Sequence, residues 1–310
     1  MDPLHTLRVF VAVADAQGFA AAARALHTSP PQVTRAIAAL EARLGLRLLH
    51  RSTRHLRLTE VGERYLADVR RLLADLDEAE AQARGAHVVP QGQLIVTAPV
   101  LFGRMHVAPL LLSFLRAHPQ VTARTLLVDR VVNLLDEGVD VAVRIAHLPD
   151  SSLTAVRVGQ VRRVIVAAEA YLAQAGEPQV PADLAHHVAI GTAITGGEPA
   201  PWALAAEPGR TDRLVAGPQP RFQLTANGGD VSIQAAREGH GLARALSYQV
   251  DDDVRAGRLK VVLAAHEPAP IPVYLVHAEG RRASAKVRAF VDHAAEHLRA
   301  HPALNGSRCA

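Results

Sequence analysis

Residues 29–44 constrain this chain most, because a helix start, an apolar stripe and a helix stop follow one another there. Ser29 can cap a helix, Pro30 suits its first turn, and Gln32 can reach back to Ser29 in a capping box. Beyond the cap, apolar residues recur at steps of four, three and four: Val33, Ile37, Leu40 and Leu44. The pattern predicts an amphipathic helix that ends at Gly45.

Polar side chains lie off this stripe at the start of the same helix, at Gln32, Thr34 and Arg35. Such groups can hydrogen-bond base edges and phosphates, and the major groove of DNA admits one α-helix. The segment is therefore a candidate recognition helix. An ordinary amphipathic surface helix is the alternative, and only the neighbouring segments can separate the two.

Two helical segments precede it. Residues 4–14 have apolar residues at helix spacing and are followed by Gly18, which is expected to end that helix. Residues 20–26 form a short alanine-rich helix, and His27 and Thr28 make the turn into Ser29. Two helices joined by a few residues, the second with polar groups at its start, are typical of a helix-turn-helix.

Residues 46–58 alternate apolar and basic side chains, which predicts a β-hairpin with Arg51, Ser52, Thr53 and Arg54 at its tip. In a winged helix-turn-helix such a tip contacts flanking phosphates or the minor groove. A solvated loop is the alternative for Arg51 and Arg54. The charge distribution supports the first interpretation: residues 1–65 hold nine arginines against five acidic residues, while the remainder is balanced.

Residues 1–65 resemble the DNA-binding domain of LysR-type transcriptional regulators. The resemblance is carried by six segments: Leu7–Ala14, Ala21–Leu26, Val33–Ile37, Leu40–Gly45, Leu48–Arg51 and Leu58–Gly62. It implies that Pro30, Pro31, Thr34 and Arg35 face DNA from the recognition helix and that Arg54 does so from the wing.

The chain departs from the family pattern around Phe19. Gly18 and Ala20 stand where the family usually has a serine and a serine or threonine, so the second helix is expected to be weakly capped. Thr34 stands where serine is usual, which keeps the hydroxyl.

A long helix is predicted from Glu60 to about Ala83, with Thr59 as its cap. It spans about 36 Å at 1.5 Å per residue. Its apolar residues alternate steps of three and four, as in a coiled-coil seam: Leu66, Val69, Leu73 and Leu76. The resembling family dimerises through this helix, so self-association through residues 60–86 is expected. Packing on the chain's own body domain is the alternative.

The second half alternates strands with helices after a linker at residues 88–92, which predicts parallel pairing through right-handed crossovers. The expected strands are 94–98, 121–128, 139–145, 163–168, 221–225, 242–246, 259–263 and 271–277. The expected helices are 104–116, 131–137, 171–175, 229–238 and 283–300, and residues 176–220 are a Pro- and Gly-rich stretch.

This order resembles the family's effector domain, a two-lobed α/β fold similar to periplasmic solute-binding proteins. It implies crossings between the lobes near residues 160–164 and 265–271. The expected organisation is a winged helix-turn-helix at 1–59, a linker and dimerisation helix at 60–86, and an effector domain at 87–303. Lobe I is about 91–162 and 269–303, and lobe II about 163–268. Ser247 stands where the family often has proline, and the tail after His301 is expected to be disordered.

Ligands of open parallel sheets bind beyond the carboxyl ends of the strands, beside helix N-termini. The candidate effector-binding residues after the first and third strands and across the cleft are Thr97, Ala98, Pro99, Val100, His147 and Asn227. The backbone near residues 100–103 could hold a carboxylate. Ordinary loop and cap roles are the alternative for each of these residues. Trp202 is expected in the core.

No enzyme, metal or cofactor site is predicted. The sixteen histidines show no metal-ligand spacing, Cys309 is the only cysteine, and the glycine-rich and nucleophile motifs are missing. No unbroken apolar run reaches membrane-spanning length and no signal peptide is evident, so no membrane partner and a cytoplasmic location are expected. A transport-type solute receptor is disfavoured by the missing signal peptide and by the basic helix-turn-helix. An enzyme on the two-lobed fold stays an alternative.

The sequence therefore predicts a LysR-like regulator whose DNA binding responds to a small molecule. The expected partners are a partly palindromic double-stranded promoter site, an unidentified effector and a second copy of the chain. By resemblance the assembly is a tetramer of two dimers, and RNA polymerase is kept open as a further partner. The effector, the operator sequence and the choice between activation and repression stay open.

Overall fold

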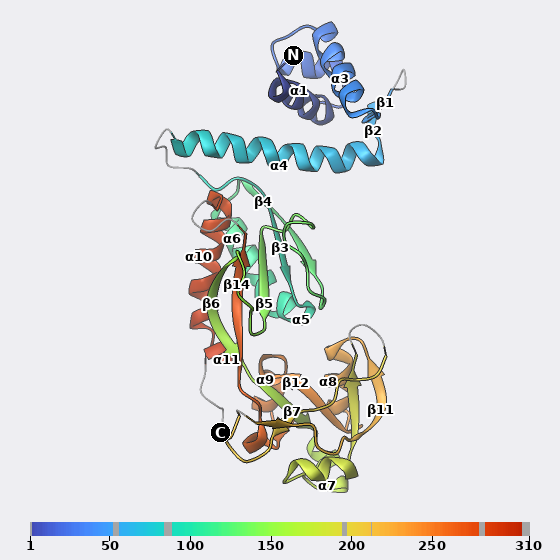
Figure 1. The fold of residues 1–310 in the computed structure, drawn as a ribbon, viewed down its shortest axis with the longest axis vertical. Helices are drawn as coiled ribbons and strands as arrows, with labels where there is room; N and C mark the ends of the chain where they lie inside the picture. Colours follow the sequence, from blue (N-terminus) through green and yellow to red (C-terminus); the bar gives the residue numbers. More distant parts are fainter. Residues whose placement is uncertain are drawn as a thin grey trace. The chain divides into compact units, whose positions relative to one another are not determined.

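In a computed structural model, the described residues are 2–51, 56–83, 89–193, 197–211, 213–278 and 283–305. The chain divides into two compact units, the first ending at Gln93 and the second beginning at Leu94. The first unit holds three short helices, a hairpin and one long helix. The second holds two mixed five-stranded sheets (Figure 1).

The first unit is a winged helix-turn-helix. Its elements are α1 (Pro3–Asp15), α2 (Phe19–Ala25), α3 (Pro30–Leu44), and the antiparallel strands β1 (Leu49–Arg51) and β2 (Leu56–Leu58). The apolar stripe of α3 lies in the core, where Val33, Ile37 and Leu40 pack with Phe10 of α1. The predicted helices and hairpin are confirmed. One detail differs, since α1 ends at Asp15 and Gly18 is instead the N-cap of α2, without a side-chain hydrogen bond.

The long helix α4 (Glu60–Ala83) begins as predicted, with Thr59 Oγ1 accepting the Gly62 N–H at 2.9 Å. Its apolar stripe, however, does not stay open for a second copy. Leu66, Val69 and Leu73 are buried in the core of the helix-turn-helix. The predicted seam is therefore wrong over these positions, because α1 of the same chain covers them.

Charged and aromatic contacts hold α4 to α1 in the same way. Arg8 donates to Asp77 at 2.5 Å, Arg70 pairs with Asp15, and the rings of Phe10 and Tyr65 lie 5.7 Å apart. Leu72, by contrast, is 51% exposed. The helix-turn-helix therefore covers one face of α4, and the face that includes Leu72 stays exposed.

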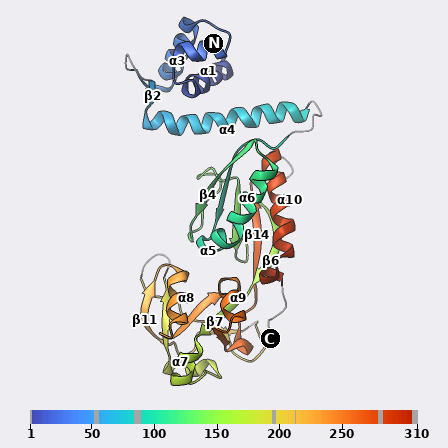
Figure 2. The same ribbon diagram turned by 180° about the vertical axis from the view of Figure 1, so that it is seen from behind.

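Lobe I of the second unit is a sheet with the strand order β4-β3-β5-β14-β6. Its strands are β3 (Gly92–Ala98), β4 (Val121–Leu127), β5 (Val141–Ile145), β6 (Thr154–Val161) and β14 (Ile271–His277). β3 and β5 are parallel as predicted, whereas β14 runs antiparallel to both β5 and β6. A continuous helical segment and α10 (Ala285–Ala300) pack with this sheet (Figure 2).

The continuous segment consists of α5 (Val100–Phe102), the π-helical turn η1 (Gly103–Val107) and α6 (Ala108–Ala117). By length and composition alone, Val100–Ala117 could cross a membrane. Its side chains Phe102, Val107, Leu111 and Phe114 are nevertheless buried in the core of lobe I.

Lobe II is a sheet with the strand order β11-β8-β12-β7-β13. Its strands are β7 (Arg163–Ala167), β8 (Val188–Thr192), β11 (Arg221–Ala226), β12 (Leu242–Leu246) and β13 (Lys260–Val262). The β-branched run of β7 suits a strand that is buried on both faces. The smaller elements are α7 (Glu169–Ala175), η2 (Pro181–His186), β9 (Leu204–Ala205), β10 (Leu214–Val215), α8 (Gly229–Arg237), α9 (Ser247–Arg255) and η3 (Ala264–His266).

The helix predicted at 131–137 is wrong. Asn133 Oδ1 accepts the N–H of Leu135, so a single turn forms and ends at Gly138. An asparagine side chain competes with the helix for backbone donors in this manner. Strands β6 and β8 and helix α9 form where none was predicted.

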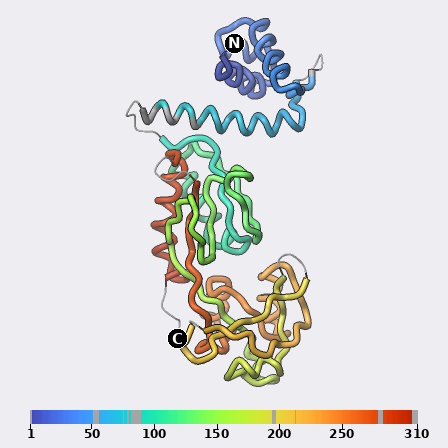
Figure 3. Tube along the Cα trace, in the orientation of Figure 1, coloured from blue at the N-terminus to red at the C-terminus, as the bar shows by residue number. Residues whose placement is uncertain are grey.

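Two crossovers join the lobes, from β6 into β7 and from β13 into β14, as predicted (Figure 3). Arg162 on the first crossover donates through Nη1 to both carboxylate oxygens of Glu267 on the second, at 2.8 and 2.9 Å. The Ser247 N–H donates to the Arg162 carbonyl at 2.8 Å. A proline at this position would lack that donor.

The tail after His301 is ordered as far as Asn305, so the expectation of disorder is wrong over these residues. They form α11 (Pro302–Asn305), whose Leu304 is buried against β6. The Asn305 amide donates to the Leu298 and Arg299 carbonyls at the end of α10. The tail closes the core of lobe I.

Candidate DNA-binding face and effector cleft

The start of α3 presents the predicted polar face. Thr34 and Arg35 are exposed, and their contacts are with their own helix: Thr34 Oγ1 donates to the Pro30 carbonyl at 3.0 Å and Arg35 Nε to the Pro31 carbonyl at 3.4 Å. Both prolines are exposed as well. The terminal guanidinium nitrogens of Arg35 and the lone pairs of the Thr34 hydroxyl stay available to a partner.

Gln32 is exposed at the same end but also serves the helix. Its Oε1 accepts the Ser29 N–H at 3.2 Å, which is one of the two bonds of a capping box, and also the Ser29 hydroxyl at 3.1 Å. Its amide NH₂ is left for a base or phosphate. Among the wing residues predicted to contact DNA, Thr53 and Arg54 lie outside the described residues. Arg51 ends β1, and its side chain is likewise outside them.

A cleft of about 490 Å³ lies between the lobes of the second unit. From lobe I it is lined by Pro99, Leu101, Asp129 and Ile145, and from lobe II mainly by residues of β7, β8, β12 and the starts of α8 and α9. This volume is in the usual range for small-molecule sites. Of the six residues predicted to bind an effector, Pro99 and Asn227 line this cleft.

The other four predicted residues have other positions. Thr97 is 4% exposed, and its hydroxyl donates to the Leu126 carbonyl of β4 at 2.7 Å. The one donor of this side chain is therefore already used within the sheet. Thr97 and Ala98 line a smaller adjoining cavity of about 140 Å³. In the backbone segment 100–103, expected to hold a ligand carboxylate, the Val100 N–H donates instead to Asp129 Oδ1 at 3.0 Å. His147 is exposed and does not line the cleft.

Sequence reasoning missed the two arginines of the cleft, Arg163 of β7 and Arg244 of β12. Burial lowers the pKa of Arg163, and burial together with the charge of Arg163 lowers the pKa of Arg244 to about 10. A signal was present at Arg244, which interrupts the otherwise apolar strand β12, whereas Arg163 only begins the apolar strand β7. Trp202 is buried in the core of lobe II as predicted.

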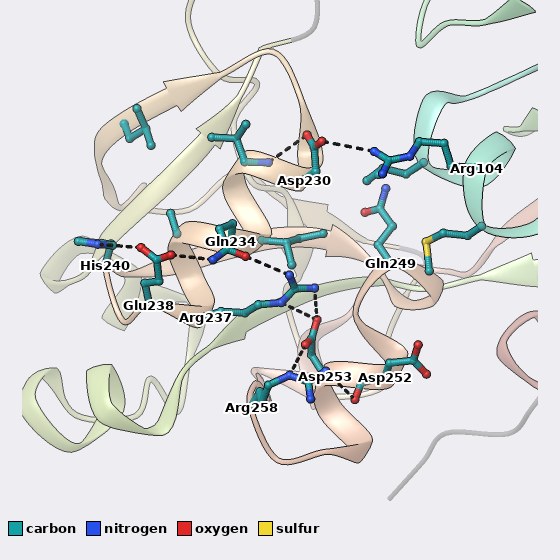
Figure 4. Close-up of a pocket in the computed structure, with 16 residues that line it drawn as sticks. Arg104, Asp230, Gln234, Arg237, Glu238, His240, Gln249, Asp252, Asp253 and Arg258 are labelled. Carbon is teal, nitrogen blue, oxygen red and sulfur yellow. Dashed lines mark hydrogen bonds and ion pairs between the residues drawn. The ribbon is translucent and has the colours of Figure 1, made fainter.

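A second, larger hollow of about 930 Å³ lies along α8 and α9 (Figure 4). Its charged groups pair with one another. Asp253 accepts from Arg237 Nε at 2.8 Å and from Arg258 Nε at 2.7 Å, and Arg104 lies 3.9 Å from Asp230. Asp253 ties α8 to α9 through Arg237, whereas the Arg104–Asp230 pair joins lobe I to lobe II, so these charges already have partners.

Two family models match separate parts of the chain. The model of the bacterial regulatory helix-turn-helix protein, lysR family, matches residues 4–63, and that of the LysR substrate binding domain matches residues 87–299. The chain belongs to the LysR family of transcriptional regulators. As a LysR-family protein it binds DNA and carries an effector-binding domain, and it is a regulator rather than an enzyme.

Similar proteins support this membership over the full length. An HTH-type transcriptional repressor of Pseudomonas aeruginosa is 33% identical over 310 residues. The match covers 98% of this chain and 95% of the repressor's length. The regulator DmlR of Escherichia coli is 34% identical over 301 residues, covering 96% and 95%. Among solved structures, the LysR-type regulator CrgA of Neisseria meningitidis matches with a TM-score of 0.58 and 29% identity, over 95% of this chain and 98% of that one.

Proposed function

We propose that this LysR-family regulator reads a partly palindromic promoter site through the start of α3 and the tip of the wing. The contacting residues are Pro30, Pro31, Gln32, Thr34, Arg35, Arg51, Thr53 and Arg54. The observation that supports this most directly is that the polar side chains at the start of α3 are exposed while its apolar stripe is buried. Thr34 and Arg35 are suited to base edges, and the arginines of the wing to phosphates or the minor groove.

The effector, in this proposal, binds in the interlobe cleft. Pro99 and Asn227 contribute to the site, and Thr97, Ala98, Val100 and His147 do not touch the ligand directly, for the structural reasons given above. Closure of the lobes about the crossovers at Arg162 and Glu267 shifts the population between two arrangements of the oligomer. The proposed domain limits are 1–59, 60–86 and 87–303, and the two lysR-family matches cover residues 4–63 and 87–299.

Self-association through α4 uses exposed residues rather than the predicted seam. Leu72 is half exposed and Val61 is 41% exposed, while Leu66, Val69 and Leu73 are already covered. A tetramer of two dimers, a contact with RNA polymerase and a cytoplasmic location belong to the same proposal. Membership of the family supports the tetramer and the contact with RNA polymerase, and binding to DNA supports the cytoplasmic location.

Footprinting on DNA upstream of the protein's own and adjoining genes tests the proposal. Arg35→Ala is expected to weaken specific binding by about 1–3 kcal/mol at fixed salt, because a base contact is lost. Arg43→Ala, at the far end of α3, is the matched control and is expected to stay near wild type. Wild-type affinity of the Arg35 variant would contradict the assignment, and absence of any protected DNA would contradict the function.

A further inference from the structure

The strand register places two arginines together in the interlobe cleft. In the antiparallel pair of β7 and β12, Leu246 lies opposite Arg163 and Arg244 lies opposite Ile165. Side chains two residues apart on a strand share a face, so Arg163 and Arg244 are diagonal neighbours on the same face of the sheet. Both line the cleft.

The two guanidinium groups are only partly satisfied. Arg244 donates to the Pro201 carbonyl at 3.0 Å and to the Ala200 carbonyl at 3.4 Å, and it lies 5.8 Å from the ring centre of Trp202. A guanidinium has five donors, so several remain. Arg163 is half buried, and no hydrogen bond or ion pair to its guanidinium is present among the described residues.

Several other arginines of this unit have carboxylate partners. Arg162 pairs with Glu267, and Arg237 and Arg258 share Asp253. The acidic residues that line the cleft, Asp129 and Glu198, are both exposed, and Asp129 accepts the Val100 N–H. Two neighbouring cations without a carboxylate between them are costly in an empty cleft and favourable once an anion enters.

We propose that the effector is a small organic anion whose carboxylate is held between the guanidinium forks of Arg163 and Arg244. Arginine forks match a carboxylate bidentately. The apolar part of the molecule packs on Leu101, Ile145 and Leu246, which line the same cleft. This inference rests on the proposed function, because it takes the interlobe cleft as the effector site.

Calorimetric titration of the full-length protein in carboxylate-free buffer tests it. The probes are succinate, benzoate and phenylacetate, each beside its uncharged amide, with inorganic phosphate as a separate arm. At least one acid is expected to bind, and its amide roughly tenfold or more weakly, as expected for loss of charge-assisted hydrogen bonds. Arg163→Gln is expected to weaken the acid by a similar factor, and Arg163→Lys by less.

Two further measurements exclude a merely structural role. Arg221→Gln removes an exposed arginine of β11 outside the cleft and is expected to bind the acid like wild type. Without ligand, Arg163→Gln is expected to melt at or above the wild-type temperature, because it removes a cation that has no partner. A clearly lower melting temperature would mean that Arg163 is structural and would overturn the proposal.

The remaining outcomes are also decisive. Equal binding of acid and amide, unchanged acid binding by Arg163→Gln, or binding of phosphate but of no acid would each overturn the carboxylate assignment. Failure of every acid to bind, in a preparation that still protects DNA, counts against it too. Loss of DNA protection by the wild-type protein itself would instead contradict the proposed function.

Discussion

The DNA-binding face and the effector cleft are built in opposite ways. The described part of the face is one end of a single helix, α3, where neighbouring residues point outward and contact mainly the backbone of their own helix. The cleft gathers residues from Pro99 to Gln249, on strands and helices of two lobes. A face of the first kind can be altered without disturbing the fold, whereas the walls of the cleft are also the frame of the domain.

The largest effect that tests this contrast is expected at Asp253, which is 2% exposed and ties α8 to α9 beside the cleft. Burial alone would raise its pKa, but hydrogen bonds from Arg237 and Arg258 lower it. Asp253→Asn is expected to reduce the free energy of unfolding of the second unit by about 3 kcal/mol, at the low end for a broken buried ion pair because both arginines are partly exposed.

Urea unfolding of Asp253→Asn measures this loss, and specific DNA affinity without ligand gives the comparison. Asp252→Asn, an exposed neighbour on α9, is the matched control and is expected within about 0.5 kcal/mol of wild type. Wild-type stability of the Asp253 variant would mean that the frame of the cleft tolerates change as well as the DNA-binding face does.

A smaller effect is expected from pH, through His106 in the π-helical turn. His106 is buried against Phe102, Tyr248 and His301, and burial, with a contribution from His301, lowers its pKa to about 4. Between this value and the unfolded pKa of about 6.5, the unfolded chain binds more protons. The stability is therefore full above pH 6.5 and falls as the pH decreases.

From pH 7 to pH 5, His106 is expected to account for about 2 kcal/mol of lost stability. Chemical unfolding of wild type and His106→Leu at both values measures it, since the variant lacks this group and should lose less. Equal losses in the two proteins would show that other groups carry the acid sensitivity of this unit.

The smallest effect is expected at Thr97. The sequence-based prediction makes Thr97 a ligand residue, whereas the structure gives its hydroxyl a role within the sheet. As a ligand residue it should change the effector response when replaced. In the structure its hydroxyl is a strand-to-strand donor, so Thr97→Val is expected to cost about 1 kcal/mol of stability and to leave carboxylate affinity unchanged. Weakened ligand binding at unchanged stability would restore the sequence-based assignment.

Much of the fold was predictable where local chemistry and tertiary structure agree. The capping groups of Ser29 and Thr59 lie where the pattern placed them, and the β-branched runs of β7 and β14 form interior strands of their sheets. Helix α9 was missed because it contains few apolar residues, Tyr248 and Val250 among them. The helix predicted at 131–137 failed because Asn133 closes a turn instead.

The sequence by itself determined the recognition helix, its exposed polar end and the family, because a helix of 3.6 residues per turn converts spacing directly into a face. Only the tertiary structure decided that α1 covers the stripe of α4, and that Arg163 and Arg244 meet in the cleft. Both depend on which distant segments pair. Strand register and helix docking are set by the packing of the whole core, which no local pattern of residues contains.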